Sequence, residues 1–221
     1  MDPAVRFASL VSGPPHALHL DQACALMSAA FTGQYRHEQV MASLDNLAAL
    51  CNQPTLDCVL AVMRTRLTGV RDDYYNPRNS FLDHVLERGV GLPISLSVVA
   101  IEVGRRLDVP IVGVGLPSHF IVRSGTSDRY GDPFNDGALF DRAGLVSRWS
   151  RLVGDGHPFD ELHLRPVDDR TILIRMLNNL RAVYAQRDEP HAMYALSIMR
   201  AGFAELAHEA PQHARWVRHL N

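Results

Sequence analysis

Three residues near the middle of the chain carry the side chains that acyl transfer or hydrolysis requires. Ser95 offers a hydroxyl nucleophile, His119 an imidazole that can take its proton, and Asp132 a carboxylate that can orient the imidazole. Ser95 would lie in the first turn of a helix, where amide dipoles favour a developing negative charge. A purely structural interpretation is also open, in which Ser95 bonds local amides while His119 and Asp132 bond only to each other.

The sequence predicts neither a metal site nor a cofactor. His119, Asp132 and Asp136 could ligate a metal in principle, but the chain has neither a His-Glu-x-x-His sequence nor cysteines paired at zinc-binding spacing. The glycine pair Gly113-x-Gly115 stands alone on a predicted strand, so it does not form a phosphate-binding loop.

The cysteines and the apolar stretches indicate in which cellular compartment the protein is expected. Cys24, Cys51 and Cys58 are odd in number and lie within helical patterns, which predicts buried thiols in a reducing cytosol. The start Met1-Asp2-Pro3-Ala4 lacks the pattern of a secretory signal. The strongest apolar stretch, Ile94 to Val103, is far shorter than the roughly 18 residues of a membrane helix. We therefore expect a cytoplasmic protein.

The composition is that of an ordinary globular protein. The 221 residues are 47% hydrophobic and 21% charged, with a formal net charge of −2. All 22 basic residues are arginine. A near-neutral chain lacks the concentrated basic surface that nucleic-acid binding needs, so we expect no nucleic-acid partner.

One helix and the strands after it must position the candidate residues. Gly91-Leu92-Pro93 indicates a helix entry, because proline is tolerated in a first turn. The helix from Ile94 to Leu107 is apolar nearly all round, which predicts a buried central helix, and Asp108-Val109-Pro110 ends it. Three predicted strands follow: Ile111 to Gly115, His119 to Arg123, and Arg129 to Asp132.

Helical patterns flank this centre on both sides. After a loop-like start around Ser12-Gly13-Pro14-Pro15, apolar residues recur at helical spacing in four segments: Asp21 to Phe31, His37 to Leu50, Thr55 to about Gly69, and Ser80 to Arg88. Three helices are predicted beyond the strands: one capped by Asp168-Asp169, one from Met193 to Ala207, and a short last one with Trp216.

This order of elements predicts an α+β fold. Its parts would be a helical amino-terminal bundle (1–73), a core with a small antiparallel sheet (74–160), and a carboxyl-terminal helical hairpin (161–221), packed as one compact unit.

Short motifs in the middle of the chain follow one another in a specific order: Asn76 to Ser80, Gly91 to Ser97, Pro117 to Phe120, and Asp132 to Gly137. In this order they resemble the transglutaminase-like family of the SirB type. The run Arg175 to Leu180 resembles that family's tetratricopeptide-like helical tail, of which this chain has room for about one hairpin. The resemblance covers most of Tyr74 to Leu206 and implies a transglutaminase- or papain-like core.

The resemblance implies a cysteine nucleophile at the helix start, a histidine on a following strand and an aspartate on the next. His119 and Asp132 match the last two, but Pro93 occupies the cysteine position. Because proline has no nucleophile, the resemblance predicts a non-catalytic protein that binds a protein or peptide. The near-neutral charge and the short apolar stretches predict neither a nucleic acid nor a membrane as partner. The alternative is a serine-dependent hydrolase or acyltransferase that uses Ser95, His119 and Asp132.

The residues around these positions are the expected contact surface for a bound segment. Arg78 and Asn79 precede a helix as turn and cap residues, and the resemblance implies that they lie at the rim of a cleft. Pro93 at the helix entry, Phe120 beside His119, and Phe134 after Asp132 complete the predicted binding residues.

Overall fold

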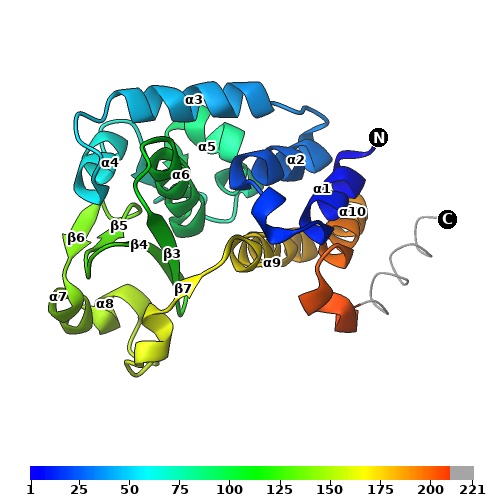
Figure 1. Ribbon diagram of the computed structural model, residues 1–221. Helices are drawn as coiled ribbons and strands as arrows, with labels where there is room; N and C mark the ends of the chain where they lie inside the picture. The colour runs from blue at the N-terminus through cyan, green and yellow to red at the C-terminus, as the bar shows by residue number, and fades with distance from the viewer. Residues whose placement is uncertain (210–221) are drawn as a thin grey trace.

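A five-stranded antiparallel sheet lies at the centre of the computed structural model, which describes residues 1–209 (Figure 1). Its strand order is β6-β5-β4-β3-β7. The bounds are β3 Ile111–Leu116, β4 His119–Ser124, β5 Tyr130–Asp132, β6 Ala138–Phe140 and β7 Pro166–Val167. The three predicted strands are thus confirmed to within a residue, whereas β6 and β7 were not predicted. Both are short and add the two edges of the sheet.

The central helix α6 runs Pro93–Arg106 and packs against β3 and β4. Pro93 occupies its first turn, where the missing N–H has no intrahelical partner. After the helix, Asp108 adopts a left-handed conformation, and the Val109 amide returns to the carbonyl of Gly104. Residues on all sides of α6 are buried, as the continuous apolar pattern predicts.

Five α-helices precede the central helix: α1 Pro3–Ser12, α2 Leu20–Thr32, α3 His37–Ala49, α4 Leu56–Met63 and α5 Leu82–Arg88. The break predicted around Ser12-Gly13-Pro14-Pro15 separates α1 from α2, but the helix α1 before it was not predicted. The Asp2 carboxylate caps α1 by accepting the Ala4 amide at 2.7 Å, and Pro3 fits the first turn.

The predicted helix from Thr55 to about Gly69 was too long. It ends at Met63, because Thr68–Gly69 forms a short strand, β1. Strand β1 pairs in parallel with β2, Val90–Gly91, directly before α6. This small ribbon fixes the position at which the chain enters the central helix.

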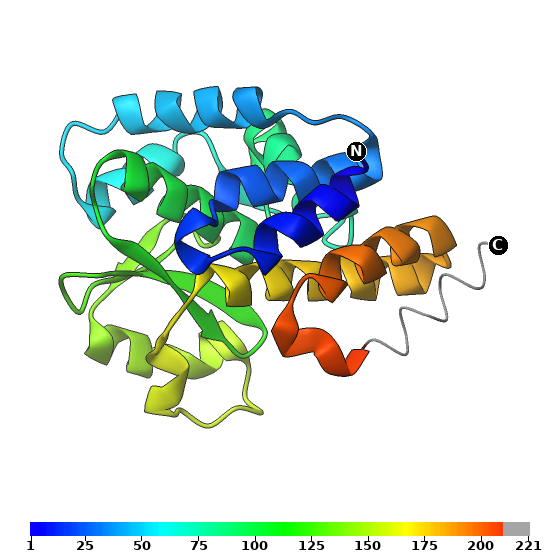
Figure 2. The ribbon, with the colours of Figure 1, turned by 45° about the vertical axis from the view of Figure 1, so that its right-hand side comes forward.

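The carboxyl-terminal helices pack against the amino-terminal ones (Figure 2). They are α9 Asp169–Arg187 and α10 Pro190–Ala201, followed by a 3₁₀ helix, Ala204–Glu209. The rings of Phe7 in α1 and Phe203 after α10 are 6.1 Å apart, and the Ser12 hydroxyl donates to the Gly202 carbonyl at 3.0 Å. One hydrophobic cluster joins residues from all three predicted regions. The predicted last helix with Trp216 lies outside the described residues.

The other face of the sheet is covered by α7 Arg142–Ser147, α8 Trp149–Val153 and a 3₁₀ helix, Glu161–Leu164. Figure 1 shows α7 and α8 below the sheet, with α6 and α4 above it. Trp149 belongs there to a second, smaller hydrophobic cluster, together with Val114 and Ile121 of the sheet. Helices thus cover both faces of a small antiparallel sheet, and the α+β prediction is confirmed.

The thiols differ from the prediction. Cys24 is buried, but Cys51 and Cys58 are partly exposed near the α3–α4 connection. Cys51 follows the end of α3, and Cys58 lies in the first turn of α4 but is not among the buried residues of that helix. Among residues 1–209, no helix is both long and apolar enough to cross a membrane.

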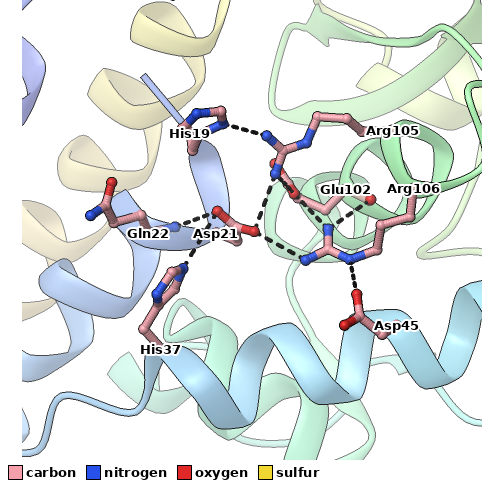
Figure 3. Close-up of polar contacts among 8 residues, drawn as sticks. All are labelled: His19, Asp21, Gln22, His37, Asp45, Glu102, Arg105 and Arg106. Carbon is pink, nitrogen blue, oxygen red and sulfur yellow. Dashed lines mark hydrogen bonds and ion pairs between the residues drawn. The ribbon is translucent and has the colours of Figure 1, made fainter. Parts of the chain in front are cut away.

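A network of charged side chains connects α2, α3 and α6 (Figure 3). Asp21 in α2 accepts from both Arg105 and Arg106 of α6 at 3.1 Å. Arg106 also donates to Asp45 of α3 at 2.6 Å and to Glu102 at 2.9 Å. Asp21 and Glu102 are 5% and 2% exposed, so these two carboxylates are largely removed from water.

Ser118, in the turn between β3 and β4, carries backbone strain. Its φ is +54°, in the left-handed region that costs most residues about 1–2 kcal/mol. Glycine avoids that cost but loses more entropy on folding, so Ser118→Gly should stabilise the protein by about 0.5 kcal/mol. Ser118→Val should instead destabilise it, since a β-branched residue is poorly tolerated at positive φ. Urea denaturation of the two variants checks the opposite signs; the same sign for both would contradict the explanation.

Candidate functional site

His119 and Asp132 form a buried pair at the start of β4 and the end of β5. The His119 Nε2 atom lies 2.8 Å from Asp132 Oδ2, and the two side chains are 8% and 0% exposed. The turn Pro117-Ser118 places His119 opposite Leu116 at the tip of the β3–β4 hairpin. The antiparallel pairing of β4 and β5 then brings Asp132 beside the imidazole.

Asp132 is held by its own loop. Its Oδ1 accepts the amides of Phe134 and Asn135 at 3.1 and 3.2 Å, and its Oδ2 accepts the Asn135 side-chain amide at 2.7 Å. An ionised carboxylate only accepts hydrogen bonds, so we assign the hydrogen of this contact to His119 Nε2. In its neutral form the imidazole is then the Nε2–H tautomer. His119 Nδ1 makes no hydrogen bond within residues 1–209, so it is the nitrogen available to a ligand or reactant.

Phe134 connects this pair to the entry of α6. Its ring is 6.0 Å from the His119 ring in an edge-to-face arrangement, and the Arg71 guanidinium lies 5.2 Å above it. A Cβ atom on Gly69 would lie 2.7 Å from the Phe134 ring, so only glycine fits there. Gly69 pairs with Gly91, two residues before Pro93. Sequence analysis identified Phe134 but not Gly69, because the contact joins segments 65 residues apart (134 − 69).

Pro93 and Ser95 offer no nucleophile toward His119. Pro93 is buried in the first turn of α6. The Ser95 hydroxyl is 0% exposed; it donates to the Asn79 carbonyl at 2.8 Å and accepts the Leu92 amide at 2.8 Å. These contacts match the capping role that the structural interpretation gave Ser95. In the described part of the chain, no hydrogen bond joins Ser95 to His119, so the geometry lends the triad no support.

Asn79 and Arg78 have different environments. Asn79 is fully buried; its amide donates to the Asp73 carbonyl at 2.9 Å, and its oxygen accepts from Arg88 at 3.0 Å. Asn79 therefore shapes the loop that precedes α5 and, through its carbonyl, the Ser95 cap. Arg78 is exposed, and its side chain makes no hydrogen bond within residues 1–209. Asn79 is thus a framework residue, whereas Arg78 is accessible from solvent.

Phe120 lies beneath an arginine that sequence analysis did not assign to the site. Phe120 is 1% exposed, and the Arg175 guanidinium from α9 lies 5.2 Å from its ring centroid. Arg175 also donates to the backbone carbonyl of His119 at 3.2 Å. The sequence pattern places the run from Arg175 to Leu180 in a helical tail and indicates no contact with the site. Nothing in the linear sequence shows that α9 reaches the tip of the hairpin.

The chemistry of this site follows from its residues. An oriented imidazole with one free nitrogen can accept or donate a proton or a hydrogen bond. Covalent catalysis also needs a nucleophile within hydrogen-bond reach of that nitrogen, and neither Pro93 nor Ser95 supplies one. Within residues 1–209, no group of three metal-ligating side chains is close enough to hold a metal ion.

A model of the transglutaminase-like superfamily matches residues 20–178, more than half of the chain. The chain belongs to this superfamily. The match begins in α2 and ends in α9, so it contains the whole His119–Asp132 site. It also extends further toward the amino terminus than the resemblance that begins at Tyr74. Helices α2 to α5 therefore belong to the family domain.

Curated relatives match parts of the chain. A UPF0162 protein of Xylella fastidiosa (strain Temecula1) is 46% identical over 126 residues, which are 55% of this chain and 45% of that protein. A UPF0162 protein of Pseudomonas aeruginosa is 36% identical over 124 residues, 55% of this chain and 45% of that protein. Mouse F-box only protein 21 is 43% identical over 70 residues, 31% of this chain and 11% of that protein. The matched stretch spans less than half of the UPF0162 relatives, and no solved structure matches the chain.

Proposed function

We propose that this chain is a SirB-type transglutaminase-like protein that binds a protein or peptide segment without covalent catalysis. The observation that carries the proposal is the combination of an intact His119–Asp132 pair with Pro93 at the family's cysteine position. The pair retains an oriented imidazole for hydrogen bonding, while the bond-forming group is missing.

The surroundings of the pair support recognition of an extended segment. Phe134 is half-buried beside the imidazole and offers an apolar contact, and His119 Nδ1 offers one polar contact. Arg71 and Arg78 are exposed on the loop that precedes α5. An aromatic surface next to a few oriented polar groups is typical of peptide-binding sites. The proposal places the protein in the cytoplasm, where its thiols stay reduced.

The absence of covalent chemistry is tested with purified protein and a fluorophosphonate probe, together with ester and amide substrates. We expect neither labelling nor turnover, because the Ser95 hydroxyl is buried and bonded to the backbone. Labelling that disappears in Ser95→Ala, with turnover lost in His119→Ala, would overturn the proposal and establish the serine-dependent hydrolase or acyltransferase.

Segment binding is tested by selecting peptides from a phage-displayed library on the folded protein. We expect enriched peptides whose affinity falls at least tenfold in Phe134→Ala, because that variant removes the apolar contact beside His119. Phe159→Ala, on the opposite face of the sheet against Trp149, is the matched control and should bind as the wild type does. A failure to enrich any Phe134-dependent peptide would contradict the binding function.

A further inference from the structure

The Arg175 guanidinium lies across the tip of the β3–β4 hairpin. Its Nη2 donates to the Leu116 carbonyl at 2.9 Å and to the His119 carbonyl at 3.2 Å, the two residues that close the turn. The guanidinium carbon is 5.2 Å from the Phe120 ring centroid. One half of the guanidinium is thus fixed by an aromatic face and by two backbone oxygens, one of which is the carbonyl of His119.

The glycine pair Gly113-x-Gly115 provides the space for this arrangement. A Cβ atom on Gly115 would clash with Arg175 Nη1 and lie 3.2 Å from its Cζ. A Cβ atom on Gly113 would lie 2.8 Å from the Phe120 ring. The two glycines therefore leave a bare strip on β3, into which the ring and the guanidinium fit. The glycine pair thus makes room for an arginine that contacts the backbone of His119.

The charge of Arg175 lacks a counter-ion in the described part of the chain. No carboxylate of residues 1–209 forms an ion pair with it, and its Nε and Nη1 make no hydrogen bond there. Arg106, another arginine with little exposure, contrasts with it, because it contacts Asp21, Asp45 and Glu102. Burial without a compensating charge lowers the pKa of Arg175 from its ordinary value. A partly buried, uncompensated guanidinium gains most from a ligand that brings the missing negative charge.

We propose that Arg175 recognises a carboxylate group of the bound protein or peptide segment. A planar carboxylate fits the free N–H groups of a guanidinium better than a neutral amide does, and charge-assisted hydrogen bonds are the stronger ones. The proposal rests on the proposed function, because it locates the carboxylate in a segment bound at His119. The carboxylate belongs either to an acidic side chain or to a chain terminus, and the two sources share this chemistry.

Three peptides separate these sources: acetyl-AEAEA-amide, acetyl-AQAQA-amide, and acetyl-AQAQA with a free terminal carboxylate. Each is titrated into ¹⁵N-labelled protein while the Nε–Hε signal of Arg175 is followed. We expect a saturable shift with at least one carboxylate peptide and none with the neutral amide. The peptide that gives the shift identifies the source of the carboxylate.

Arg175→Gln should weaken binding of the responding peptide at least tenfold. Arg187→Gln changes an exposed arginine at the end of the same helix and should leave the affinity unchanged. Equal affinity in Arg175→Gln and wild type, or an unmoved Nε–Hε signal at the highest concentration of all three peptides, would overturn the proposal. The wild-type titration decides the matter even if Arg175→Gln does not fold. Turnover in the substrate assays would refute the non-catalytic function while leaving an Arg175-dependent shift intact, so the two failures are distinguishable.

Discussion

Replacing Asp132 by alanine should lower the free energy of unfolding by about 4 kcal/mol, as expected when a buried, fully bonded carboxylate is removed. The carboxylate is 0% exposed and accepts four hydrogen bonds, two from backbone amides and two from side chains. Alanine would leave the partly buried amides of Phe134 and Asn135 without their hydrogen-bond acceptor. It would also release the His119 ring. Equilibrium urea denaturation measures the effect.

Two variants control for this prediction. Asp132→Asn keeps the shape and one acceptor oxygen, so we expect about half of the loss. Asp128 is an exposed aspartate on the preceding turn, 68% exposed and paired with Arg123, so Asp128→Ala should change stability by less than about 1 kcal/mol. If Asp132→Ala also cost less than about 1 kcal/mol, the carboxylate would not be the organiser of this site.

Replacing Asp21 by asparagine should cost about 3 kcal/mol at pH 7, because it removes one of the two carboxylates that Arg105 and Arg106 share in the network of Figure 3. The value lies at the lower end for a buried pair, since Arg105 is 42% exposed and can be partly rehydrated. Asp57→Asn is the matched control, because Asp57 pairs with the exposed Arg129 and should leave the denaturation midpoint nearly unchanged.

The pH dependence of the Asp21 effect has a definite sign. Burial opposes ionisation of Asp21, but the hydrogen bond from Arg106 and the charge of Arg105 outweigh it and lower its pKa. A lowered pKa stabilises the fold above the ordinary pKa of the carboxyl group, and the contribution is lost as the pH falls through the folded-state value. The difference between wild type and Asp21→Asn should therefore be largest near neutrality and shrink below about pH 4.

The contribution of Glu102 to stability depends on pH with the opposite sign. Burial raises its pKa and the charge of Asp21 raises it further, with Arg105 and Arg106 only partly compensating. Its contribution is therefore fully present at low pH and lost as the pH rises through its folded-state pKa. A difference between wild type and Asp21→Asn that grew on acidification would contradict this account of the network.

The sequence alone does not predict this network of charged side chains. Arg105 and Arg106 come at the end of α6, Asp21 lies in α2 and Asp45 in α3, so no spacing along the chain connects them. Only the packing of three helices brings these opposite charges together, with Asp21 and Glu102 largely buried. Helix α1 is different, because its signals were present: an aspartate cap, a proline in the first turn, and buried Phe7 and Val11 at helical spacing. They were outweighed by the glycine and prolines that follow.

The amino-acid sequence by itself determined the α+β class, the central helix, the three main strands and the motif order that indicates the superfamily. These are properties of local periodicity, of breakers such as Pro93 and Pro110, and of residues close together in the chain. The tertiary structure decided what the motifs do. It put the Ser95 hydroxyl onto backbone groups and brought Arg175 from a distant helix to the carbonyl of His119. Such contacts join residues that are far apart in the sequence, so the spacing of residues along the chain does not predict them.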